Sequence, residues 1–135
     1  MTYYINTTTQ LTFDDTIALV KDRLGDEGFG VLSEIDVTAK IKEKLDREYR
    51  NYRILGACNP AYAYEALQTE PYIGTMLPCN VVVQEWDDGR VDVAAIDPLA
   101  SMQAVDNPEL KRIAAEIKEK LAKVIGRLGA DAAGH

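Results

Sequence analysis

Histidine is almost absent from this chain of 135 residues, which carries its only histidine at position 135. Ser/His/Asp and Cys/His catalysis use a histidine as the general base. Both are therefore excluded unless a carboxylate or a lysine substitutes. Glycine-rich phosphate-binding motifs are also missing, since the stretch GDEGFG is typical of a helix end followed by a turn. The sequence offers no motif for nucleotide chemistry.

Cysteine is scarce as well, with only Cys58 and Cys79 and no Cys-x-x-Cys motif. A closed zinc site needs four ligands. One chain cannot supply them from two cysteines and a terminal histidine. A symmetric site of four cysteines would require two copies of the chain.

Positive charge is in deficit, with 15 Lys and Arg against 22 Asp and Glu and a net charge of −7. This balance repels phosphate backbones and anionic lipid surfaces, so we expect neither nucleic acid nor a membrane as a partner. The start MTYYINTTTQ is neither basic nor apolar, and no run approaches the ~20 apolar residues of a membrane span. We expect a cytoplasmic protein whose cysteines remain thiols.

The patterns that are present predict one α+β domain over residues 1–129, followed by a flexible C-terminal tail, 130–135. Alternating or β-branched segments predict strands at 3–8, 29–37, 52–57, 79–86 and 90–96. Apolar residues spaced three or four apart predict helices that begin near residues 13, 38, 60 and 108. Asp88-Gly89 predicts a tight turn between the last two strands. This hairpin favours a two-layer fold, with a mixed or mainly antiparallel sheet of about five strands and helices packed on one face.

Polar residues at the predicted helix starts are typical of caps. Thr12 with Asp15 resembles a capping box, and Asn59 and Asn107 each precede a proline. Thr38 is the predicted cap of the second helix, whose buried stripe would be Ile41, Leu45 and Tyr49. Gly129 is the predicted end of the last helix.

Cys58 is the residue most suited to chemistry, because it precedes the cap residue Asn59. Unpaired amides and the helix dipole at that position stabilise negative charge and can lower a thiol pKa below about 8.5. Buried cysteines at strand ends are equally typical of core packing. If the third helix folds back on the sheet, Cys79 can approach the same sheet end. The two could then form a redox dithiol, bind a soft metal or a sulfur species, or remain separate thiols.

Tyrosine is abundant, with seven residues against two phenylalanines. Five of the tyrosines lie around the Cys58 segment. Their amphipathic rings suit an interface or a half-buried surface better than a ligand pocket. These five are Tyr49, Tyr52, Tyr62, Tyr64 and Tyr72.

The segments GACNP, LPCNVVV and AIDP, with their spacing and flanking helices, resemble the domain-of-unknown-function 302 family. The resemblance extends from Tyr3 to about Leu128. It implies a compact α+β fold and a homodimer, and it brings no established activity. The matching positions are Gly56, Asn59, Pro60, Leu77, Pro78, Asp97 and Pro98.

Three functions stay open at this point. The first is binding of a small ligand, a sulfur species or a soft metal near Cys58, Asn59, Cys79 and Asp97. The second is a thiol-redox enzyme in which Cys58 is the nucleophile and Cys79 resolves it. The third is a purely structural dimerisation module. A second copy of the chain is the expected partner, because a sheet covered on one face leaves a surface or an edge to be covered. The sequence identifies no cofactor.

Overall fold

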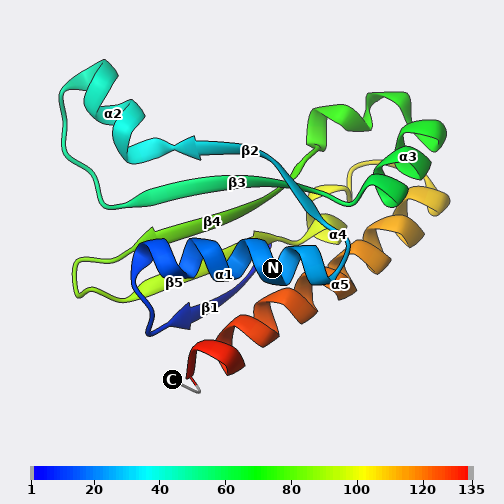
Figure 1. The fold of residues 1–135 in the computed structure, drawn as a ribbon. Helices are drawn as coiled ribbons and strands as arrows, with labels where there is room; N and C mark the ends of the chain where they lie inside the picture. The colour runs from blue at the N-terminus through cyan, green and yellow to red at the C-terminus, as the bar shows by residue number, and fades with distance from the viewer. Residues whose placement is uncertain (1, 134–135) are drawn as a thin grey trace.

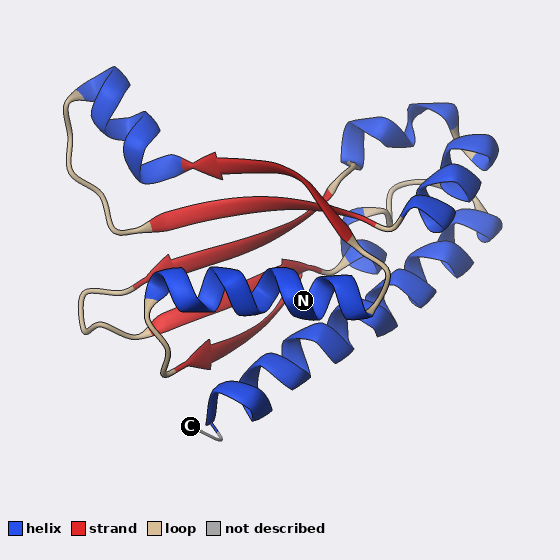
Figure 2. Ribbon diagram, in the orientation of Figure 1, coloured by secondary structure: helices blue, strands red, loops and turns tan. Residues whose placement is uncertain are grey.

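The computed structural model of the protein describes residues 2–133 and is drawn in Figures 1 and 2. All four strand pairs are antiparallel, and the strand order is β1-β5-β4-β3-β2. The predicted α+β fold with a mainly antiparallel sheet is confirmed. The elements in chain order are β1 (Tyr4–Thr9), α1 (Phe13–Asp26), β2 (Gly30–Asp36), α2 (Val37–Leu45), β3 (Tyr52–Cys58), α3 (Pro60–Thr69), the 3-10 helix η1 (Pro71–Met76), β4 (Cys79–Glu85), β5 (Val91–Ile96), α4 (Pro98–Ser101) and α5 (Pro108–Ala133).

The core lies between one face of the sheet and the helices α1 and α5, which run across that face in Figure 1. Side chains alternate between the two faces of a strand, so every second residue of β3, β4 and β5 points into the core. The apolar stripe predicted for the last helix is buried against them. The core residues include Leu55, Val81, Val83, Val93, Leu110, Ile113, Leu121 and Leu128.

The helix starts at Thr12 and Asn107 are capped as predicted. Thr12 Oγ1 accepts a hydrogen bond from the Asp15 amide at 3.1 Å, and Asn107 Oδ1 accepts one from the Leu110 amide at 3.1 Å. These side chains satisfy amides that have no partner inside the helix. The short helices η1 and α4 were not predicted, because neither segment has an apolar period.

Helix α5 continues through Gly129 to Ala133, so the predicted end at Gly129 is wrong. A Cβ atom on Gly129 would lie 2.9 Å from Thr7 Oγ1 of β1. The glycine therefore allows a close approach of α5 to β1. Residues 134–135 of the predicted tail lie outside the described part of the chain.

The start of α2 also differs from the prediction. The side chain of Asp36 caps the helix by accepting a hydrogen bond from the Ala39 amide at 3.0 Å. The Thr38 hydroxyl instead bonds to the start of β3, where it accepts from the Tyr52 amide at 2.9 Å and donates to the Arg50 carbonyl at 2.7 Å. Thr38 thus ties the helix to the sheet.

The buried stripe predicted for α2 is absent, because none of this helix's residues is buried. The helix stands at the far end of β2 and β3, away from the body of the domain (Figure 1). Leu45 is 65% exposed, and Tyr49 lies beyond the end of the helix. An apolar stripe becomes buried only where another element packs against it.

Candidate functional site

The predicted cysteine site is not assembled as a pair. Both cysteines are free, and no disulfide joins them. In the strand ladder Cys79 lies opposite Ala57, while Cys58 lies opposite Gly30. The register does not set the two thiols directly opposite each other, and the structure does not show the predicted dithiol or two-thiolate site.

Cys79 is a core residue. Burial, with a smaller contribution from the charge of Cys58, raises the pKa of Cys79 to about 11. A thiol with that pKa is neutral near pH 7, and it is the thiolate that attacks disulfides or binds soft metals. Both cysteines line an apolar void of only about 20 Å³ together with Phe29, Tyr62 and Ile117. That volume holds no ligand larger than a water molecule.

Asn59 occupies the cap position of α3, but its side chain makes no capping hydrogen bond. Its Nδ2 atom donates to the Glu27 carbonyl at 3.1 Å. It also packs on Gly28, which has the left-handed φ of 85°. The predicted side-chain cap is wrong, because the close turn after α1 takes up this amide.

Asp97 is a buried carboxylate with structural partners. Its Oδ1 accepts hydrogen bonds from the amides of Leu99 at 3.0 Å and Ala100 at 3.4 Å, which caps the short helix α4. Its Oδ2 lies 2.9 Å from Lys118 Nζ of α5. The carboxylate therefore joins α4 to α5.

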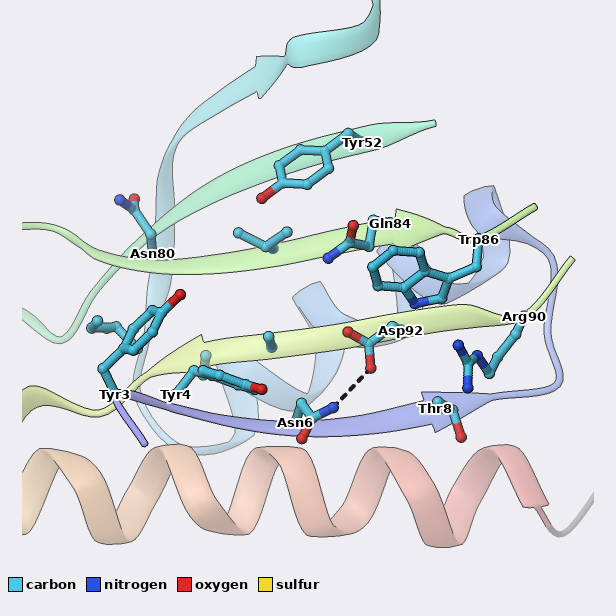
Figure 3. A pocket seen from close by; sticks show the side chains of 14 residues that line it. Tyr3, Tyr4, Asn6, Thr8, Tyr52, Asn80, Gln84, Trp86, Arg90 and Asp92 are labelled. Atoms are coloured by element: carbon cyan, nitrogen blue, oxygen red, sulfur yellow. Dashed lines mark hydrogen bonds between the residues drawn. The ribbon is translucent and has the colours of Figure 1, made fainter. Parts of the chain in front are cut away.

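A hollow lies on the face of the sheet opposite the core, where the outward-pointing residues of β1, β4 and β5 meet (Figure 3). Its volume is about 460 Å³, within the range of small-molecule sites. Small apolar side chains form its floor, and aromatic and amide side chains surround them. The main lining residues are Tyr3, Tyr4, Asn6, Tyr52, Asn80, Val82, Gln84, Trp86, Arg90, Asp92 and Ala94.

One end of the hollow is formed by Trp86, whose ring attracts two cationic side chains. The guanidinium carbon of Arg50 lies 4.6 Å from the ring centroid of Trp86 and 4.7 Å from that of Tyr49. The guanidinium carbon of Arg90 lies 5.9 Å from the Trp86 centroid. All three distances are those of cation–π interactions. Trp86 thus holds two cationic side chains at this end of the hollow.

Asp92 lies in the hollow between Trp86 and β1 (Figure 3). The residue is only 7% exposed, and its Oδ1 accepts a hydrogen bond from Asn6 Nδ2 at 3.1 Å. Within residues 2–133 no other group donates to the carboxylate, and no cationic side chain forms an ion pair with it. A buried carboxylate is costly without a counter-charge.

The phenol of Tyr52 borders the hollow from β3. Burial is the main cause that raises the pKa of Tyr52, with a smaller contribution from Tyr49. The hydroxyl therefore stays neutral and can donate a hydrogen bond near pH 7.

The hollow was not predicted from the sequence, although two signals were present. Asp92 stands between Val91 and Val93 in a strand that is otherwise apolar. A charged residue on the outward face of a central strand indicates that this face is not covered by the core. The alternation of β1 points Asn6 to the same face.

Two features are absent from the described residues 2–133. No group of three or more His, Cys, Asp or Glu residues there could hold a metal ion. In the same range no helix is long and apolar enough to cross a membrane.

The fold and the hollow define a small two-layer α+β domain with one sheet face left open by the helices. Residues 5–128 match the family described as "Domain of unknown function DUF302", and the chain belongs to that family.

Similar proteins include a solved structure and a curated relative. A solved structure, described as the crystal structure of an uncharacterized conserved protein DUF302 from Bacillus stearothermophilus, has a TM-score of 0.89 and 30% sequence identity. The similarity covers 95% of this chain and 99% of that one. An uncharacterized protein from Aquifex aeolicus (strain VF5) is 28% identical over 87 residues, which are 64% of this chain and 54% of the relative. The chain thus spans about half the length of the Aquifex protein, and neither description states an activity.

Proposed function

We propose that the protein binds a small organic molecule in the hollow on the open face of its sheet. The observation that carries the proposal is the hollow itself, about 460 Å³ in volume and lined by aromatic rings and side-chain amides. The proposal keeps the predicted function of small-ligand binding. It moves the site from the cysteine end of the sheet to the opposite face.

The composition of the hollow supports binding over nucleophilic catalysis. Tyrosine and tryptophan rings offer apolar contact with few rotatable bonds, and the amides of Asn6, Asn80 and Gln84 can orient a ligand by hydrogen bonds. No cysteine, histidine, serine or lysine is among the described residues that line the hollow. The usual nucleophile and base pairs are therefore missing at this place.

Filling the hollow tests the proposal. Ala94 lies on the floor, opposite Asn6 of β1 and Val82 of β4. We expect Ala94→Leu to leave the protein folded and to weaken binding at least about tenfold, because the larger side chain occupies the ligand's volume. A fragment collection titrated against the emission of Trp86, the single tryptophan of the chain, measures binding.

Ala122→Leu is the matched control, because Ala122 is exposed on α5. It should bind every fragment as the natural protein does. Unchanged affinity in Ala94→Leu, or no fragment bound by the natural protein, would contradict the proposal.

A second candidate function is homodimerisation through the arm formed by β2 and α2. The strand β2 is at the edge of the sheet, and within the described residues no strand lies on its outer side. Leu32 of β2 is 71% exposed, and Leu45 of α2 is comparably exposed. An unpaired edge with exposed apolar side chains favours association with another copy.

Sedimentation at micromolar concentration tests this candidate. We expect about twice the mass of one chain, which is 15.0 kDa. Leu45→Glu should shift the protein towards the monomer, because it places a charge in the apolar contact. Leu67→Glu, on the exposed side of α3, is the control and should remain dimeric. A monomeric natural protein would exclude the arm as an interface.

A further inference from the structure

We propose that the ligand of the hollow is a small organic cation, of the alkylammonium or arylalkylammonium class, whose positive charge pairs with Asp92. The inference rests on the proposed function and specifies the chemistry of the same site. Its basis is a buried carboxylate that has one neutral hydrogen-bond donor and no counter-charge in the described chain.

The surroundings of Asp92 leave one oxygen for a ligand. Oδ1 accepts the hydrogen bond from Asn6, whereas Oδ2 has no donor within residues 2–133. The fully buried polar atoms that lack a partner do not include Oδ2, so this oxygen has accessible surface. It is therefore reachable from the hollow. An ammonium group at Oδ2 would supply the missing charge and donate a charge-assisted hydrogen bond.

Arg90, which precedes β5, is the cationic side chain nearest to Asp92 in the sequence. It forms no ion pair with Asp92, and its guanidinium carbon lies 5.9 Å from the ring centroid of Trp86. Arg50 is likewise stacked on aromatic rings, outside the lining of the hollow. Both arginines are thus held by Trp86 and leave the carboxylate without a partner.

The aromatic lining also favours a cation over an anion. The rings of Tyr4 and Tyr52 offer negative faces or phenolic oxygens around the carboxylate, whereas Trp86 already stacks with Arg50 and Arg90. An anionic ligand would be repelled by Asp92 and by the net charge of −7. A divalent metal ion is a poorer match, because it requires several oxygen ligands and Asp92 is the only carboxylate among the described lining residues. An organic cation can use both the carboxylate and the apolar floor.

Three probes of one size and different charge test the inference at pH 7: 2-phenylethylammonium, 2-phenylethanol and 3-phenylpropionate. Binding is measured by the emission of Trp86 and by calorimetry. We expect the ammonium to bind at least about tenfold more tightly than the alcohol, and the carboxylate to bind most weakly. Added salt should weaken binding of the ammonium and leave binding of the alcohol unchanged.

Asp92→Asn removes the charge and keeps an oxygen that can accept from Asn6. In this variant we expect the ammonium to bind no more tightly than the alcohol. Asp22→Asn is the control, because it changes the net charge equally at an exposed position of α1. It should retain the preference for the ammonium.

The outcomes separate the inference from the proposed function. If the alcohol binds as tightly as the ammonium, and salt affects neither, the cation is wrong while the hollow remains a binding site. If none of the three probes binds at millimolar concentration, the cation is overturned, and the fragment titration of Ala94→Leu and the natural protein decides the hollow. The probe and salt comparisons use the natural protein, so they decide the inference even if Asp92→Asn does not fold.

Discussion

Replacing Leu121 by alanine is expected to lower the free energy of unfolding by about 3 kcal/mol or more. Leu121 is in the middle of α5, is 0% exposed, and belongs to the core between α5 and the sheet. Truncation removes buried apolar surface and leaves a cavity that the neighbouring side chains fill only in part. Urea unfolding followed by circular dichroism measures the loss.

Leu67→Ala is the matched control for Leu121→Ala. Leu67 is also a helical leucine, but it is 45% exposed on α3. Its truncation should cost less than about 1 kcal/mol, because much of the side chain already contacts water. Equal losses in the two variants would contradict the burial of α5 against the sheet.

The second large effect is expected for Gly56→Val in β3. A Cβ atom at Gly56 would lie 2.2 Å from Ser33 Oγ and 2.7 Å from Pro78 Cγ. The serine hydroxyl can rotate away, whereas the proline ring is held by its own backbone. We expect a loss of about 3 kcal/mol in the free energy of unfolding, at the upper end of the usual cost of overpacking.

Gly126→Ala is expected to change the free energy of unfolding in the opposite direction. Gly126 is exposed within α5, and an added Cβ atom there would meet nothing within 4 Å. Alanine should stabilise the helix by up to about 1 kcal/mol. If Gly56→Val were as stable as the natural protein, the close packing of β2, β3 and the segment before β4 would be wrong.

Local patterns in the sequence were sufficient for most of the secondary structure. The strands, α1 and α5 follow from periods of two and of three to four residues, since these periods decide which side chains share a face. The caps at Thr12 and Asn107 follow from neighbours three residues away. Such interactions join residues close in the chain, so the sequence alone contains them.

Burial of a predicted face depended on the tertiary structure. The apolar stripe of α5 is buried, whereas the similar pattern of Ile41 and Leu45 in α2 is not. The two helices differ in where the fold places them, because α5 lies on the sheet and α2 stands beyond the ends of β2 and β3. No local pattern in the sequence contains that information.

The location of the candidate site also depended on the tertiary structure. The separation of 21 positions between Cys58 and Cys79 is compatible with a pair, but the register of β3 and β4 sets Ala57 against Cys79. Asn6 and Asp92 are 86 residues apart, and they form a hydrogen bond because β1 pairs with β5 at the edge of the sheet. The sequence by itself determined the residue types, the elements and the family likeness. Only the strand order and register decided which side chains share the open face, because contacts between strands distant in the chain arise from the packing of the whole domain.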